Sequence, residues 1–253
     1  MTVNPRDFLN GQTPLQRAQQ NKLMAVDWIY RWGSTSSQVL RLCLSKESAS
    51  WSSIAVKRGL LRSTRTESGV PAVFYTLSEM GLELAHHHAT SLIAYPELDP
   101  YRVNQSKLRH DLMVQRLSIT AQREGLVTKV QSEREVNDGD QRGEKRPDAI
   151  WHLRDGRRIG IELELSAKWG RKLDDFIAAI ATAIDPAQAP NGLDAFSIVT
   201  DSEPIVDRYR EAMKPGQPMR RWAKNARNHW VIEEETVVPD WMHGRIDFRV
   251  ITG

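Results

Sequence analysis

Apolar residues in the first part of the chain follow helical spacing, interrupted by short polar breaks. From residue 14 to residue 32 they recur at mostly helical spacing, and Gly33 ends the run, which predicts a first helix. Serine-rich breaks at 34–37 and 48–53 supply side-chain oxygens of the kind that cap helix starts. They predict two further short helices, the second of them over residues 54–61.

A hairpin and a fourth helix are predicted next. The segment 70–76 reads as a strand, and residues 62–66 are placed to pair with it across a turn. The stretch Thr-Leu-Ser-Glu-Met-Gly at 76–81 then opens a helix. Helix, helix, helix, hairpin is the order of a winged helix-turn-helix, and the 76–81 stretch resembles the one that commonly follows the wing in that family. The alternative is a generic small helical domain with a hairpin.

Periodicity is lost between residues 86 and 101, where Pro96 and Pro100 interrupt the chain. We therefore expect two domains, residues 1–95 and residues 96–253. Two domains also fit the length of 253 residues, because single domains commonly contain about 100 to 150 residues.

The second half of the chain predicts a mixed core of helices and strands. The expected elements are a helix at 108–124, strands at 127–135, 149–153 and 159–165, a helix at 173–184 and a strand at 196–200. This order describes a hairpin followed by a crossover connection. Residues 230–251 are expected to add one or two strands. The predicted fold class is thus α/β, of the α+β kind.

Composition narrows the class of protein. With 40% hydrophobic and 26% charged residues, the chain is expected to be globular rather than disordered. The single cysteine, Cys43, forms no internal disulfide and no cysteine zinc cluster, so a reducing cytoplasm is the expected location. No apolar run reaches the roughly 18 residues of a membrane helix, and the start lacks the pattern of a secretory signal. Membrane and export roles are not expected.

The net charge of +3 says little by itself, but its distribution is uneven. Up to Ala85 the chain carries ten basic residues against six acidic ones. Lys57 and Arg58 lie on the expected recognition helix, and Arg62 and Arg65 lie on the expected hairpin. Because basic side chains neutralise phosphates, these four are the candidate DNA-binding residues of the first domain.

The residues that carry chemistry lie in the predicted hairpin of the second half. On its later strand Glu162 and Glu164 share one face, because side chains alternate along a strand. A two-residue turn would pair Asp148 with Leu163 and place polar residues opposite apolar ones across the hairpin, so this turn is not favoured. A three-residue loop at 154–156, closed by Gly156 in the left-handed conformation, instead places Asp148 opposite Glu162. All apolar residues then share a face, so we predict this register, with the Asp148 and Glu162 side chains side by side.

Opposed carboxylates on neighbouring strands repel one another unless something positive lies between them. A small number of oxygen ligands, with room left for water and phosphate, suits Mg²⁺ or Mn²⁺ in phosphoryl-transfer chemistry. Asp148, Glu162 and Glu164 are therefore candidate metal ligands, with Lys168 nearby in the sequence. The alternative is a solvated sheet face on which the two glutamates face water and Lys168 starts a helix. The combination of Pro-Asp, hairpin, Glu-x-Glu and lysine favours the metal site.

The motif Pro-Asp at 147–148, a hairpin and Glu-x-Glu at 162–164 resemble the restriction-endonuclease-like nucleases of the PD-(D/E)xK superfamily. Glu164 stands where the usual lysine of that superfamily is found, a variant also seen in some restriction enzymes, and Lys168 lies beyond the strand. More narrowly, a winged helix followed by His-Asp-Leu at 110–112, Pro-Asp and Glu-x-Glu is similar to the replication-relaxation family, which includes the MobC-type relaxases of mobilisable plasmids. The fold implied is a winged helix followed by a restriction-endonuclease-like mixed-sheet domain.

This resemblance implies an endonuclease that nicks one strand at a plasmid transfer origin during conjugative mobilisation. Asp148, Glu162 and Glu164 then hold the metal and water or hydroxide attacks, while the ion and Lys168 stabilise the developing charge. His110 lies on the first core helix, where it contacts phosphate or supports the carboxylates; a satisfied histidine at the helix start is the alternative. The implied partners are double-stranded DNA, single-stranded DNA after nicking, and a conjugative coupling protein or accessory relaxosome protein.

A second basic segment contains Arg220, Arg221 and Lys224, with Trp222 and Trp230 interleaved. Basic residues neutralise phosphates and tryptophan stacks on unpaired bases, so the three cations are further candidate DNA-binding residues. The alternative is a solvated helix whose tryptophans lie in the core. For the whole chain, the alternative to a nickase is a non-catalytic winged-helix regulator or accessory factor with a degenerate nuclease fold.

Overall fold

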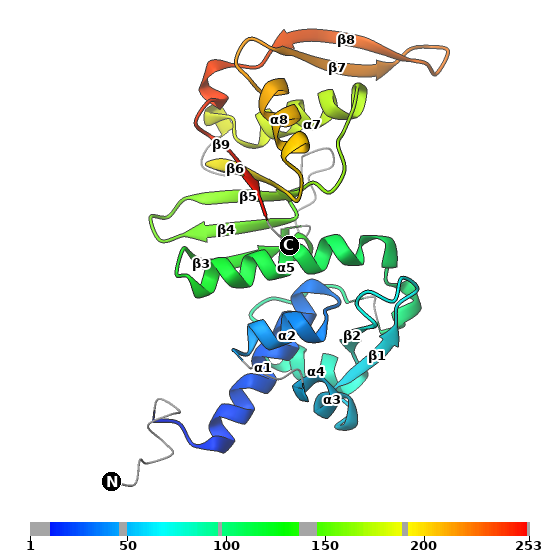
Figure 1. The fold of residues 1–253 in the computed structure, drawn as a ribbon, viewed down its shortest axis with the longest axis vertical. Helices are drawn as coiled ribbons and strands as arrows, with labels where there is room; N and C mark the ends of the chain where they lie inside the picture. The colour runs from blue at the N-terminus through cyan, green and yellow to red at the C-terminus, as the bar shows by residue number, and fades with distance from the viewer. Residues whose placement is uncertain (1–10, 46–49, 96–97, 137–145, 189–191, 252–253) are drawn as a thin grey trace. The chain divides into compact units, whose positions relative to one another are not determined.

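The structure is a computed structural model that describes residues 11–45, 50–95, 98–136, 146–188 and 192–251 (Figure 1). The chain divides into two compact units, Met1–Thr120 and Ala121–Gly253. This division lies later in the chain than the expected boundary after residue 95. Each unit combines helices with β-sheet, so the fold has the mixed α/β character, of the α+β kind, that the sequence predicts.

The first unit begins with a helix whose start is fixed by side chains. α1 (Pro14–Trp32) follows Thr13, whose hydroxyl accepts a hydrogen bond from the Gln16 N–H at 3.2 Å, while the Gln16 side chain accepts one from the Thr13 N–H at 2.8 Å. This reciprocal pair satisfies N–H groups that the first turn of a helix leaves without partners. Gly33, with φ 83°, ends the helix. The predicted first helix is confirmed at both ends.

The rest of the first unit follows the predicted order of helices and hairpin. Its elements are α2 (Ser37–Cys43), α3 (Ser50–Lys57), β1 (Leu61–Arg65), β2 (Val73–Leu77), α4 (Glu79–His88) and the 3-10 turns η2 (Pro100–Arg102) and η3 (Gln105–Lys107). The hydroxyl of Ser36 caps α2 and that of Ser78 caps α4. β1 and β2 pair antiparallel. The helix predicted over 54–61 is displaced, because it ends at Lys57 and residue 61 already belongs to β1.

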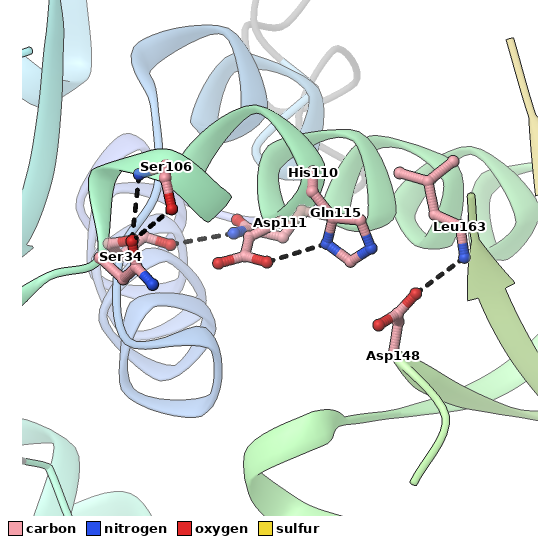
Figure 2. A network of polar contacts seen from close by, with 8 residues as sticks. Ser34, Ser106, His110, Asp111, Gln115, Asp148 and Leu163 are labelled. Carbon is pink, nitrogen blue, oxygen red and sulfur yellow. Dashed lines mark hydrogen bonds and ion pairs between the residues drawn. The ribbon is translucent and has the colours of Figure 1, made fainter. Parts of the chain in front are cut away.

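α5 (Leu108–Arg123) carries a buried polar hub of the first unit. Gln115 on this helix is 0% exposed. Its Oε1 accepts hydrogen bonds from the Trp28 indole at 2.9 Å and the Thr35 hydroxyl at 2.8 Å. Its Nε2 donates to the Ser34 carbonyl at 2.9 Å, the one bond of this network drawn in Figure 2. These bonds tie α5 to α1 and to the segment before α2, because buried polar groups are stable only when they are paired.

The second unit is built on a five-stranded sheet of order β3-β4-β5-β6-β9. Its strands are β3 (Val127–Ser132), β4 (Ala149–Leu153), β5 (Arg158–Leu163), β6 (Ala195–Thr200) and β9 (Ile246–Val250). β3, β4 and β5 pair antiparallel, whereas β6 runs parallel to β5 and β9 parallel to β6. α7 (Arg171–Ala183) connects β5 to β6, as a parallel pair requires. The predicted hairpin followed by a crossover is confirmed.

The core of the second unit lies where α7 and α8 (Glu203–Ala212) meet the sheet. Ile177 and Ile180 from α7 and Phe196 of β6 belong to the same buried cluster, and all three are almost fully buried. Gly160 on β5 is needed for the close approach, because a Cβ at this residue would lie 2.7 Å from the Phe196 ring. The glycine in this strand therefore reflects packing.

Two expectations for this unit are wrong in detail. Its remaining elements are α6 (Glu133–Val136), η4 (Pro186–Gln188), β7 (Pro218–Lys224), β8 (Trp230–Val237) and η5 (Asp240–Met242). β3 is shorter than the predicted strand because the Glu135 carboxylate accepts from the Ser132 N–H at 2.8 Å and begins the turn of α6. The segment around 220–224 is a strand of the separate β7–β8 hairpin rather than a solvated helix (Figure 1). The strands expected within 230–251 are β8 and β9.

Candidate functional site

The β4–β5 hairpin has the predicted three-residue loop. Gly156 has φ 89°, the left-handed conformation that closes such a turn, and the Leu153 N–H donates to the Arg157 carbonyl at 2.9 Å. The ladder continues regularly to the pair of Ala149 with Ile161. The register deduced from the apolar pattern is therefore confirmed along the whole of β4.

Asp148 lies immediately before this ladder, one position from the pair of Ala149 with Ile161. Its N–H donates to the Ile161 carbonyl at 2.9 Å, so the backbone leaves the regular ladder at this residue. Its Oδ2 accepts a hydrogen bond from the Leu163 N–H at 2.7 Å (Figure 2). The carboxylate is thus held by the main chain at the end of β5. Its predicted place beside the Glu162 side chain stays a prediction.

Glu162 and Glu164 are both buried, with 5% of each residue exposed. Glu162 lies within β5, and the Glu164 N–H continues the pairing with β6 by donating to the Val199 carbonyl at 2.8 Å. Buried carboxylates need charged or hydrogen-bonding partners, because removing a charge from water is costly. The burial of both side chains contradicts the alternative of a solvated sheet face.

The Glu164 carboxylate is held by two neighbours. Oε1 forms an ion pair with Nζ of Lys168, and Oε2 accepts a hydrogen bond from the Tyr209 hydroxyl at 3.2 Å. The backbone N–H of Lys168 in turn donates to the Tyr209 oxygen at 3.1 Å. The structure therefore brings Lys168, predicted only from its nearness in sequence, onto one of the predicted acidic residues.

Tyr209 is the residue of this cluster that sequence reasoning missed. It lies on α8 and is 0% exposed. Burial raises the pKa of its phenol above the ordinary value, opposed by the hydrogen bond from the Lys168 N–H and reinforced by the negative charge of Glu162. The hydroxyl therefore keeps its proton at neutral pH. The signal for α8 was the spacing of Val206 and Tyr209 among charged residues, which predicts a helix with one buried face.

These contacts limit how a metal ion fits. Both oxygens of Glu164 already have partners, in Lys168 and Tyr209, so this carboxylate serves as an ion-pair acceptor in the structure. Over the ranges that the structure describes, no group of three or more His, Cys, Asp or Glu side chains is arranged to hold a metal. Mg²⁺ is commonly held by one or two carboxylates together with waters and substrate phosphates, so a smaller ligand set made of Asp148 and Glu162 stays a prediction.

His110, the remaining candidate catalytic residue, lies on α5 in the first unit. Its Nδ1 lies 3.0 Å from the Asp111 carboxylate, and 27% of its side chain is exposed. Figure 2 shows the imidazole and this neighbouring carboxylate. The pairing of His110 with Asp111 in the first turn of α5 fits a structural role for this histidine. A role beside the carboxylates of the second unit stays a prediction.

The candidate DNA-binding residues of the first unit lie where the sequence places them, at the end of α3 and on β1. Lys57, Arg58, Arg62 and Arg65 are all exposed. Arg62 is partly engaged, because it donates to the Leu98 carbonyl at 2.7 Å. Lys57, Arg58 and Arg65 form no ion pair with any described residue, so phosphate would not have to displace a carboxylate from them.

The cations of the second basic segment lie on β7 and are differently placed. Arg220 pairs with Glu235 at 2.6 Å and Arg221 with Glu234 at 3.8 Å, both across the β7–β8 hairpin. Lys224 lies 5.4 Å from the ring centre of Trp230. Phosphate must therefore compete with carboxylates for both arginines, which weakens the case for DNA binding at this hairpin.

Comparison of the chain with protein-family models, with curated proteins and with solved structures gives no match. Function is therefore inferred from the residues and their geometry. Among the described residues no helix has both the length and the apolar character needed to cross a membrane.

Proposed function

We propose that this chain is a DNA-binding, metal-dependent endonuclease that nicks one strand at a plasmid transfer origin. The observation that carries the proposal is the β4–β5 register, which pairs Ala149 with Ile161 and holds the Asp148 carboxylate on the Leu163 N–H, next in the chain to Glu162. A buried carboxylate and a main-chain-anchored carboxylate on neighbouring strands, with Lys168 close to the same strand, match the residue pattern on which the resemblance to PD-(D/E)xK nucleases was based.

DNA binding is proposed for a winged helix in the first unit. Three helices, a hairpin and a fourth helix occur in the order expected of that fold. In that arrangement α3 is the recognition helix and β1–β2 the wing, and both carry exposed cations. Binding through such cations releases condensed counterions, so the affinity should fall as salt rises.

In the second unit, Asp148 and Glu162 would hold Mg²⁺ or Mn²⁺. The bound cation supplies stabilisation of negative charge at the phosphate and activates water. The main-chain N–H of Leu163 orients the Asp148 carboxylate, and the Tyr209 hydroxyl orients Glu164. Glu164 in turn fixes the ammonium group of Lys168 at the end of β5, where it is placed to stabilise charge on a bound phosphate.

Relaxation of supercoiled plasmid carrying the cognate origin tests the proposal. With Mg²⁺ or Mn²⁺ present we expect nicked circles from the natural chain, and a loss of roughly 100-fold or more in rate for Asp148→Asn, because a bound cation contributes several kcal/mol of charge stabilisation. Asp155→Asn is the matched control, since Asp155 lies on the exposed loop of the same hairpin. Equal rates for the two variants would remove the proposed metal role of Asp148.

A second candidate, a non-catalytic DNA-binding regulator or accessory factor, is favoured by one observation. The Glu164 carboxylate has Lys168 on one oxygen and Tyr209 on the other, which takes one of the three predicted ligands away from a metal. The same plasmid assay separates the candidates, because the regulator retards the DNA without nicking it under any metal condition.

The DNA surface is tested separately from cleavage. Lys57→Ala with Arg58→Ala should weaken binding to the origin and lower its salt dependence, since two phosphate contacts are lost. Arg210→Ala with Lys214→Ala removes the same charge from residues that pair with Asp207 and Glu211 on the second unit, and should leave binding unchanged. Equal effects from the two double variants would show that α3 is the wrong helix.

A further inference from the structure

A pocket of about 340 Å³ lies between the start of α1 and α3 in the first unit. Small-molecule sites in proteins have volumes of about 300 to 1,000 Å³, so this pocket accepts a compact ligand. Its apolar lining includes Ala18 from α1 and Trp51 and Ile54 from α3. The indole offers a flat surface against which an aromatic ring packs well.

The charged residues of the pocket are all of one sign. Arg17, Lys22 and Arg58 line it, and none of its described lining residues is acidic. Within the described ranges none of these three cations forms an ion pair. Lys57, next to Arg58 in the chain, is exposed outside the pocket lining. An anionic group entering the pocket would therefore meet cations not already neutralised.

A buried amide gives an independent indication of a ligand. Asn21 lines the pocket and is only 4% exposed. Its side-chain amide makes no hydrogen bond with any residue that the structure describes. Among the described residues, Asn21 is not one of those whose polar side-chain atoms are both sealed from solvent and unpaired, so its amide is open to the pocket, where a ligand or water can bond to it.

From these features we infer that the pocket binds a small amphipathic anion, a flat aromatic body bearing one carboxylate, sulfonate or phosphate. The ring packs on Trp51 and Ile54, the anion lies among the three cations, and Asn21 bonds to a polar atom of the ring system. Binding itself does not require the proposed nuclease activity. If DNA also binds α3 as proposed, ligand and DNA phosphate compete for Arg58.

The test uses two dyes that share a ring system. 1-Anilinonaphthalene-8-sulfonate carries the anion and N-phenyl-1-naphthylamine lacks it, and both fluoresce more strongly in an apolar site. The full chain should bind the sulfonate dye saturably at one site. Ala18→Phe fills the pocket from an exposed helical position and should weaken both dyes by about tenfold or more, whereas Gln19→Phe, on the same helix but outside the lining, should not.

The charge requirement is tested at α3. Arg58→Ala should weaken the sulfonate dye by about two- to fivefold and leave the neutral dye unchanged, because only a partly exposed charge contact is lost. Lys57→Ala is the matched control and should change neither. Equal binding by the Ala18→Phe and Gln19→Phe variants, or equal losses for both dyes in Arg58→Ala, would overturn the assignment.

Discussion

Each unit contains a buried polar network, and the two networks are built from different groups. In the first unit Gln115 is surrounded by an indole, a hydroxyl and a carbonyl, all of them neutral. In the second unit Glu164 is surrounded by the ammonium group of Lys168 and the phenol of Tyr209. Both central residues are buried, and both are reached from elements far apart in the sequence.

The difference indicates which network exists for stability alone. A neutral amide loses modest hydration on burial, and its hydrogen bonds replace that loss. An ion pair loses much more, so that apolar residues of similar size in its place are often at least as stable. The Gln115 network is therefore accounted for by the packing of α5 against its neighbours. The Glu164–Lys168 pair gains little net stability from its burial, so it is the better candidate for a functional role.

Breaking the charged network should have the largest effect on stability. Lys168→Met removes the cation and leaves the buried Glu164 carboxylate with only the Tyr209 hydroxyl, which should lower the free energy of unfolding by roughly 3 kcal/mol. The measurement is urea unfolding followed by tryptophan fluorescence. Adding Glu164→Gln to the same chain should restore most of the loss, because the uncompensated charge is removed.

If Lys168→Met alone left the unfolding midpoint unchanged, the ion pair would be no more than a surface contact. The ion pair would then not hold the Lys168 ammonium group in a fixed place near β5. Only the nicking rates of Lys168 variants could then support its proposed role in charge stabilisation.

The neutral network should show the next largest loss. Gln115→Leu leaves the Trp28 N–H and the Thr35 hydroxyl buried without their acceptor, which should cost about 2 kcal/mol. Gln19→Leu, at an exposed position of α1, is the control and should change stability by less than about 0.5 kcal/mol. A similar loss in both variants would mean that the effect comes from the new leucine rather than from the broken hub.

Removing a single hydroxyl from the charged network should have a smaller effect. Tyr209→Phe deletes the donor to Glu164 and the acceptor of the Lys168 N–H while the ring stays in the core, and should lower the free energy of unfolding by about 1.5 kcal/mol. Tyr101→Phe is the control, because Tyr101 is 85% exposed. In the plasmid assay Tyr209→Phe should slow nicking beyond what its stability loss explains, since Lys168 is less well oriented; an unchanged rate would limit Tyr209 to a structural role.

Much of the fold could be predicted because local patterns decided it. The apolar spacing of α1 and its glycine end gave both bounds of that helix, and alternation together with Gly156 fixed the hairpin register. Prediction failed where side chains competed with the periodicity. Glu135 bonds back to the Ser132 N–H and ends β3 early, a contact that periodicity does not report.

The candidate site was predictable only in part, because it depends on contacts between distant segments. The sequence identified Asp148, Glu162, Glu164 and Lys168 through one hairpin and its strand. It did not identify Tyr209, which lies some 40 residues from Lys168 and reaches it only through the packing of α8 on the sheet. The sequence also gave no sign that glutamates of β8 pair with the β7 arginines, since that depends on the register of a second hairpin.

The smallest expected effect is a pH dependence of stability that arises from a histidine of the second unit. His152 on β4 bonds to Gln131 at 2.6 Å, and burial, followed by the positive charges of Lys129 and Arg158, lowers the pKa of its imidazole below the ordinary value of 6.5. The unfolded chain therefore takes up this proton more readily than the folded one. Its contribution to stability is complete above pH 6.5 and is lost as the pH falls through the lower folded value.

Urea unfolding at about pH 8, 6.5 and 5.5 should accordingly show a falling midpoint, with a shallower fall for His152→Gln. The loss caused by Gln115→Leu should be the same at all three values, because no group in its network titrates over this range. A Gln115→Leu loss that changed with pH would mean that a titrating group is coupled to the Gln115 network, which would then not be a purely neutral one. An equal slope for the natural chain and His152→Gln would place the titrating group at another residue of the chain.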